Sequence, residues 1–245
     1  MVGGITAKIF KKHETLFCIL LIVLYIVANS FCIQNFGYTS LMSVVINTAL
    51  SLLLVAIMLV LKRTAYYGLT KVRDLKKYLY FLPLLIIVSV NLWNGFNINN
   101  TATEILFHIL TMLNIGFIEE IIFRGFLFKM MAKNNVKSAI IVSAITFGAG
   151  HIVNLFVGAE LIPTLIQICY AASIGYLFVI IFYKSQSLVP CIVTHSLVNS
   201  LSVFNVENTL SLYIAPVILI IVPLGYGFYI KKLKNNIVLR HKSYL

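Results

Sequence analysis

Apolar runs of about 20 residues recur along this chain and constrain what it can fold into. A run of that length crosses the hydrocarbon core of a bilayer as an α-helix, which satisfies its own backbone hydrogen bonds. The runs extend from residue 15 to residue 230 without a long polar segment between them. Only 11% of the residues are charged, whereas soluble domains carry roughly 25%. We therefore predict one all-α, polytopic integral membrane protein.

The apolar runs predict about eight transmembrane helices, and the basic residues predict their orientation. The expected helices lie near residues 15–34, 41–61, 78–94, 103–128, 138–158, 161–183, 187–205 and 211–230. Lysine and arginine are enriched in loops that stay in the cytoplasm. Every one of the 19 basic residues except Arg124 precedes the first helix, lies in every second connection, or follows the last helix. We therefore expect both termini to be cytoplasmic.

The net charge of +12 belongs to these ends and loops. Such a basic collar is expected to face the anionic headgroups of the lipid bilayer, and it gives no reason to expect nucleic-acid binding. Ala28-Asn29-Ser30 loosely resembles a signal-peptide cleavage site, but the apolar run continues beyond it, so we expect an uncleaved helix. The chain is small and shows no organelle signal, which favours the plasma membrane of a bacterium.

Cysteine usage predicts neither a disulfide frame nor a metal site. The four cysteines form no CxxC pair, and all fall within expected helices. We interpret them as inert buried thiols.

Ionisable residues inside the expected helices are the second informative feature. The segment 117–128 reads FIEEIIFRGFLF and places Glu119, Glu120 and Arg124 in apolar surroundings. A charge at the bilayer centre costs at least about 2.5–3.5 kcal/mol, so such residues either serve a site or satisfy one another. The i, i+4 spacing of Glu120 and Arg124 favours an internal ion pair.

Three further polar residues can meet these glutamates. His151 closes the segment FGAGH, and His195 and Asn199 lie four residues apart, so they share one helix face. Glu119, His151 and His195 each lie roughly 15–21 Å along their helices from a cytoplasmic basic residue, at about 1.5 Å per residue. Any one of them alone could merely hydrogen-bond a neighbouring helix. Their common depth predicts that they meet in one site.

These residue types can activate water. A glutamate can accept a proton from a bound water that a neighbouring imidazole orients. Amide and imidazole N–H groups can then stabilise the oxyanion formed when that water attacks a peptide bond. One Glu and two His could instead ligate zinc, or serve a transporter as a proton relay. A non-enzymatic immunity or scaffold protein of the membrane is a third hypothesis.

Three ordered motifs carry a family resemblance. They are Glu-Glu-x-x-x-Arg at 119–124, Phe-x-x-x-His at 147–151 and His-x-x-x-Asn at 195–199. Over roughly residues 103–204 the chain resembles the CAAX protease and bacteriocin-processing family, also called Abi, of intramembrane glutamate endopeptidases. The resemblance implies hydrolysis of a membrane-associated peptide or protein without a cofactor. It also favours metal-independent chemistry over zinc, and the zinc motif HExxH is absent.

The resemblance also implies roles for single residues. Glu119 would be the catalytic glutamate, acting with His151 on water, and His195 and Asn199 would form the oxyanion site. Glu120 and Arg124 would be mainly structural or orienting.

The resemblance divides the chain into three parts. Residues 103–204 would be the catalytic core, and residues 1–102 would be accessory N-terminal helices. Residues 205–245 would be the last helix and a basic cytoplasmic tail. A prenylated C-terminal tail, a bacteriocin or pheromone leader, and another membrane-associated peptide all fit as substrates.

Overall fold

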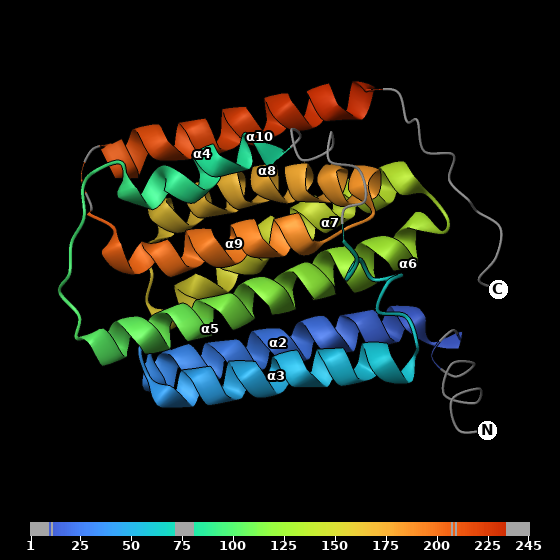
Figure 1. Ribbon diagram of the computed structural model, residues 1–245, viewed down its shortest axis with the longest axis horizontal. Coiled ribbons are helices and arrows are strands. Elements are labelled where there is room, and N and C mark those ends of the chain that lie inside the picture. Colours follow the sequence, from blue (N-terminus) through green and yellow to red (C-terminus); the bar gives the residue numbers. More distant parts are fainter. Residues whose placement is uncertain (1–9, 11, 72–80, 207, 209, 234–245) are drawn as a thin grey trace.

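The computed structural model describes residues 10, 12–71, 81–206, 208 and 210–233, and its regular structure is helical throughout these residues (Figure 1). Six of the described helices are long and apolar enough to cross a membrane. They are Glu14–Phe36, Leu41–Val60, Ala102–Ala132, Val136–Val157, Leu161–Ser185 and Leu212–Lys232. The predicted all-α class and multi-pass membrane character are therefore confirmed.

The other two expected helices are short in the described part of the chain. The third is represented by α4 (Leu84–Ser89) and the 3₁₀ turn η2 (Val90–Leu92), and residues 78–80 of the expected span lie outside the described residues. The seventh is α9 (Val189–Leu201), which continues into the 3₁₀ turn η5 (Ser202–Phe204). The orientation of the loops and termini stays a prediction.

The first two long helices, α2 (Glu14–Phe36) and α3 (Leu41–Val60), form an antiparallel pair. Gly37 ends α2 with a φ of 69°, a left-handed conformation that glycine adopts without steric cost. Ser40 then caps α3 by accepting a hydrogen bond from the Ser43 amide at 3.1 Å. These two local features reverse the chain within four residues.

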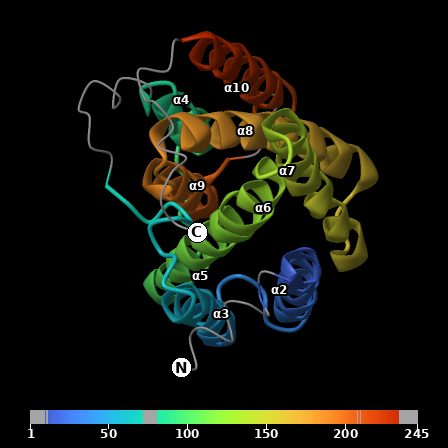
Figure 2. The ribbon, with the colours of Figure 1, turned by 90° about the vertical axis from the view of Figure 1, so that its right-hand side faces the viewer.

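The longest helix runs through the centre of the molecule. It comprises α5 (Ala102–Glu120), the π-helical segment η3 (Ile121–Phe128) and α6 (Lys129–Ala132). Figure 2 shows it between the α2–α3 pair and the layer that contains α8 and α9. Thr101 and Glu104 begin it with a capping box, in which each side chain accepts a hydrogen bond from the other's backbone amide. A π-helical segment is rare and frequently marks a functional site.

The remaining long helices lie on the other side of this central helix (Figure 2). They are α7 (Val136–Gly150) with the 3₁₀ segment η4 (His151–Val157), α8 (Leu161–Ser185), and α10 (Ala215–Lys232), which follows the π-helical turn η6 (Leu210–Ile214). The last of them, α10, packs against the outer face of α8. Gly148 lets α7 approach α8 closely, because a Cβ there would lie 2.7 Å from the Ala172 Cβ. Small residues commonly permit such close packing between membrane helices.

Candidate active site

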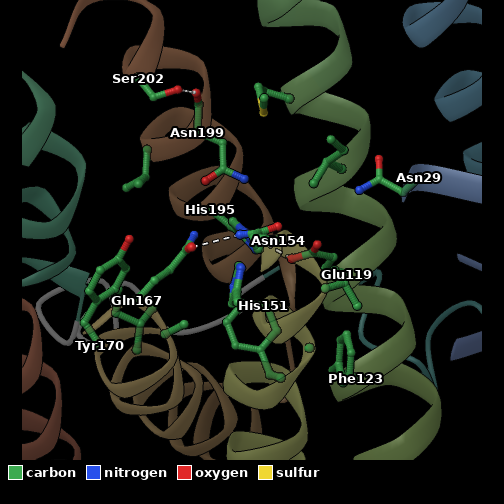
Figure 3. Close-up of a pocket in the computed structure, with 18 of the residues that line it drawn as sticks. Asn29, Glu119, Phe123, His151, Asn154, Gln167, Tyr170, His195, Asn199 and Ser202 are labelled. Atoms are coloured by element: carbon green, nitrogen blue, oxygen red, sulfur yellow. Dashed lines mark hydrogen bonds and ion pairs between the residues drawn. The ribbon is translucent and has the colours of Figure 1, made fainter. Parts of the chain in front are cut away.

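A cavity of about 340 Å³ lies between α2, α5, η4, α8 and α9. Glu119, His151, His195 and Asn199 all line it (Figure 3). Glu119 is the penultimate residue of α5, His151 begins η4, and the other two come from α9. The structure therefore brings together the four residues that the sequence predicted to meet.

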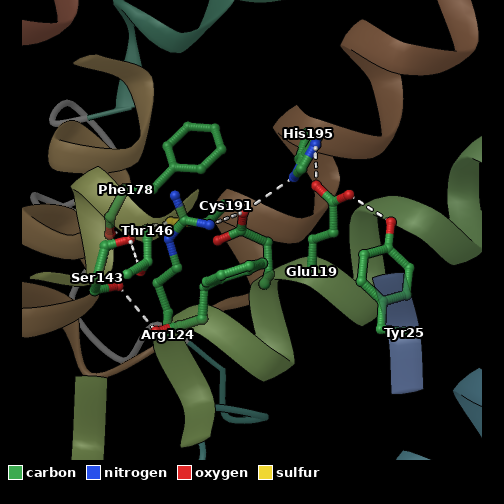
Figure 4. Close-up of polar contacts among 10 residues, drawn as sticks. Tyr25, Glu119, Arg124, Ser143, Thr146, Phe178, Cys191 and His195 are labelled. Carbon is green, nitrogen blue, oxygen red and sulfur yellow. Dashed lines mark hydrogen bonds and ion pairs between the residues drawn. The ribbon is translucent and has the colours of Figure 1, made fainter. Parts of the chain in front are cut away.

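Two side chains hold the Glu119 carboxylate. Its Oε2 atom lies 3.5 Å from His195 Nε2, and its Oε1 atom accepts a 2.5 Å hydrogen bond from the Tyr25 hydroxyl (Figure 4). The direct imidazole neighbour of Glu119 is thus His195. Tyr25 belongs to α2, far from the three motifs in sequence.

His195 contacts both adjacent glutamates. Its Nδ1 atom lies 3.0 Å from Glu120 Oε1, the same oxygen that pairs with Arg124. An ionised carboxylate can only accept hydrogen bonds, so Nδ1 carries the hydrogen and donates it. This bond fixes the plane of the imidazole and leaves Nε2 facing Glu119.

Glu120 and Arg124 form the ion pair that their i, i+4 spacing predicted. Arg124 Nη1 lies 3.0 Å from Glu120 Oε1, and both side chains are 0% exposed. The guanidinium lies 4.0 Å from the ring centroid of Phe147 and 5.7 Å from that of Phe178, so aromatic rings surround the cation. The pair lies behind the wall of the cavity and anchors His195 from there.

His151 and Asn199 complete the polar part of the cavity. The His151 ring meets the Phe147 ring edge-on, with the centroids 5.7 Å apart. The Asn199 backbone oxygen accepts a hydrogen bond from the Ser202 hydroxyl at 2.7 Å and lies 3.2 Å from His108 Nε2. These contacts hold the end of α9, from which the Asn199 side chain points into the cavity (Figure 3).

Several polar residues that line the cavity were not singled out from the sequence. They are Tyr25, Asn29, Tyr38, Asn91, His108, Asn154, Gln167 and Tyr170. Amide side chains inside apolar runs are a usable signal, so Asn154 and Gln167 could have been found. A tyrosine gives no comparable signal, because it is common in membrane helices near the interface.

The charge of Glu119 also affects the turn between α2 and α3. Burial raises the pKa of Tyr38, and the negative charge of Glu119 raises it further, so this phenol stays neutral. Within the described residues, no three His, Cys, Asp or Glu side chains are grouped so that they could hold a metal ion.

Comparison with known proteins identifies the part of the chain that carries this site. Residues 101–201 match the family model described as type II CAAX prenyl endopeptidase, Rce1-like. These residues are an Rce1-like CAAX endopeptidase domain. The Rce1-like domain begins at the N-cap of α5 and ends with the last residue of α9. Its family indicates a peptide hydrolase. No curated protein and no solved structure matches the chain.

The Rce1-like domain contains all six residues that the motifs singled out, and it coincides closely with the region of resemblance at 103–204. Tyr25, which donates to Glu119, lies outside the matched residues. The division of the rest of the chain into accessory helices and a tail stays a prediction.

Proposed function

We propose that this protein is an intramembrane endopeptidase that hydrolyses a peptide bond in a membrane-associated peptide or protein. The observation that supports this most directly is that Glu119, His151, His195 and Asn199 belong to an Rce1-like domain and line one cavity. The cavity volume of about 340 Å³ falls within the range of roughly 300–1,000 Å³ that ligand pockets usually have.

In the proposed mechanism, a water molecule in the cavity is held by Glu119 and His151. Glu119 takes a proton from this water, and the hydroxide attacks the carbonyl carbon of the scissile bond. The carbonyl oxygen becomes an oxyanion, which the Asn199 amide stabilises together with His195 Nε2 when that atom carries a proton. The C–N bond then breaks, and the leaving amine takes the proton from Glu119.

The ion pair behind the cavity has an orienting role in this mechanism. Glu120 accepts the Nδ1 hydrogen of His195 and thereby fixes which ring nitrogen faces the cavity. Arg124 holds the Glu120 carboxylate through the 3.0 Å ion pair. Neither residue needs to contact the substrate.

The substrate reaches the site within a bilayer in this proposal. A prenylated C-terminal tail and a bacteriocin leader both present a short peptide at the membrane surface, and both remain candidates. The basic loops would contact anionic headgroups, and a bacterial plasma membrane is the proposed location.

The test compares the membrane peptides of cells that carry the wild type or Glu119→Gln. We expect at least one peptide to be shortened by the wild type and retained at full length with Glu119→Gln. Glu160→Gln is the matched control, because this exposed glutamate precedes α8 and lies outside the cavity. It should give the wild-type profile.

Two results would contradict the proposal. Identical profiles for wild type and Glu119→Gln, under conditions where the wild type changes the phenotype, would favour a transporter or an immunity protein. Loss of cleavage with Glu160→Gln as well would mean that the effect does not come from the site. Equal amounts of the three proteins in the membrane must be verified by immunoblot.

A further inference from the structure

We propose that Asn154 and Gln167 form a subsite for the backbone of the peptide substrate, about two residues from the bond that is cut. This proposal rests on the proposed endopeptidase function. The two amides line the same cavity as the four predicted catalytic residues, and Figure 3 shows them among those residues. Neither belongs to the three sequence motifs.

The local conformation of η4 explains why Asn154 faces the cavity. In a 3₁₀ helix, residues i and i+3 are eclipsed on one face. Asn154 follows His151 by three positions within this 3₁₀ segment, so both side chains point to the same side. Three residues of 3₁₀ helix advance about 6 Å. An extended peptide advances about 3.3 Å per residue, so Asn154 is about two substrate residues from His151.

The hydrogen bond between the two amides leaves a donor and an acceptor for a ligand. Asn154 Nδ2 donates to Gln167 Oε1 at 2.8 Å. An amide side chain has one acceptor oxygen and one donor nitrogen with two hydrogens. Asn154 Oδ1 and Gln167 Nε2 therefore retain the capacity to accept and to donate. A peptide unit presents the complementary N–H and C=O groups.

The chemistry of the pair suits a peptide backbone better than a specific side chain. Both amides are neutral and half-buried, so they can bind a polar neutral group without a charged partner. Such contacts hold the substrate equally in its ground state and its transition state. Losing them should therefore raise KM and leave kcat unchanged.

The experiment uses the peptide that wild-type cells shorten and Glu119→Gln cells retain. This peptide is synthesised together with analogues in which one backbone amide at a time is N-methylated on either side of the scissile bond. Purified wild type and Gln167→Met are compared in detergent micelles. We expect Gln167→Met to raise KM about fivefold, the effect of one typical hydrogen bond.

The N-methyl series separates substrate binding from a merely structural bridge between η4 and α8. One N-methyl group, about two residues from the scissile bond, should raise KM for the wild type by a similar factor. The same analogue should have little additional effect on Asn154→Leu, because the acceptor of that substrate N–H, Asn154 Oδ1, is already lost. Gln167→Met loses the donor to the substrate carbonyl oxygen instead and should keep most of the response to N-methylation.

Asn114→Leu is the matched control. Its Nδ2 atom lies 3.1 Å from Thr48 Oγ1 in a contact between α5 and α3, outside the cavity. This variant also loses an amide hydrogen bond between helices, and it should keep the wild-type KM and the full response to N-methylation.

The outcomes distinguish the subsite from the function on which it rests. If Glu119→Gln cells match the wild type, the endopeptidase function fails and the subsite is rejected with it. If that comparison succeeds but Gln167→Met keeps the wild-type KM, or lowers kcat alone, only the subsite is rejected. Purely multiplicative effects of N-methylation and Asn154→Leu would reject it too. Failure of both Gln167→Met and Asn154→Leu to fold would assign the pair to structure.

Discussion

Replacing Arg124 by methionine should destabilise the protein strongly, and the structure indicates by how much. Arg124 and Glu120 are each 0% exposed and are joined by a 3.0 Å contact. Removing one partner of a buried ion pair typically costs about 3–5 kcal/mol, because the other charge is left uncompensated. Native proteins are stable by only about 5–15 kcal/mol. Arg124→Met should therefore lose a large part of the free energy of unfolding.

The double variant Glu120→Gln/Arg124→Met provides the critical comparison. Neither buried charge remains in it, and the glutamine oxygen can still accept the Nδ1 hydrogen of His195. The pair already leaves Glu120 Oε2 and Arg124 Nε and Nη2 without a hydrogen-bond partner among the described residues. Replacing the ion pair by neutral groups should therefore lower the free energy of unfolding far less than Arg124→Met and Glu120→Gln do in sum.

Equilibrium unfolding in mixed detergent micelles measures the free energy of unfolding of Arg124→Met, Glu120→Gln and the double variant. The fluorescence of Trp93, the one tryptophan of the chain, reports the transition, and its ring packs against the hydrophobic core. We expect each single variant to lose about 3–5 kcal/mol and the double variant to recover most of that loss. Additive losses would refute the view that uncompensated charge, rather than lost packing against Phe147, is the cause.

Two further predictions concern helix packing and metal dependence. Gly116→Ala should destabilise the protein by about 1–3 kcal/mol and slow cleavage. The added Cβ would lie 2.8 Å from the backbone nitrogen of Ser196, the residue after His195. Melting curves measure the loss of stability, and peptide cleavage assays measure the rate. Gly225→Ala is the control, since nothing lies within 4 Å of that Cβ, and equal effects of the two variants would contradict the packing argument. Purified protein should also cleave its substrate after exhaustive chelation, because Glu119 activates water directly in the proposed mechanism; activity lost on chelation and restored by zinc would refute this.

The fold class followed from hydropathy, whereas helix length in two segments did not. A run of apolar residues reports what a segment can be buried in, not how far its backbone stays helical. Residues 187–205 are apolar enough, but α9 starts only at Val189 and tightens into a 3₁₀ turn at Ser202. The π-helical segment Ile121–Phe128 packs against α7, α2 and α8. These neighbours are distant in sequence, so no local pattern of residues predicts the segment.

The candidate site was predictable wherever a residue is costly in a membrane. Glu119 and Arg124 stand out because charge is rare in apolar helices, and His195 stands out for its spacing to Asn199. Which imidazole contacts Glu119 could not be predicted, since His151 and His195 have similar expected depths. The contact with His195 depends on the packing of α5 against α9, where Gly116 admits Ser196. The spacing of residues within one helix does not predict which residues of another helix they will contact.

The role of α2 shows why the matched domain does not contain the whole site. Residues 101–201 hold the four predicted catalytic residues, but one of the two contacts of the Glu119 carboxylate comes from Tyr25 of α2. Further along the same helix, Gln34 donates a 3.0 Å hydrogen bond to the backbone oxygen of Phe156 in η4. A single helix thus touches both segments that present the proposed water-activating residues, α5 and η4. In the proposed mechanism, movement of α2 would alter the position of Glu119 relative to His151, so this N-terminal helix would contribute to the catalytic geometry through Tyr25 and Gln34.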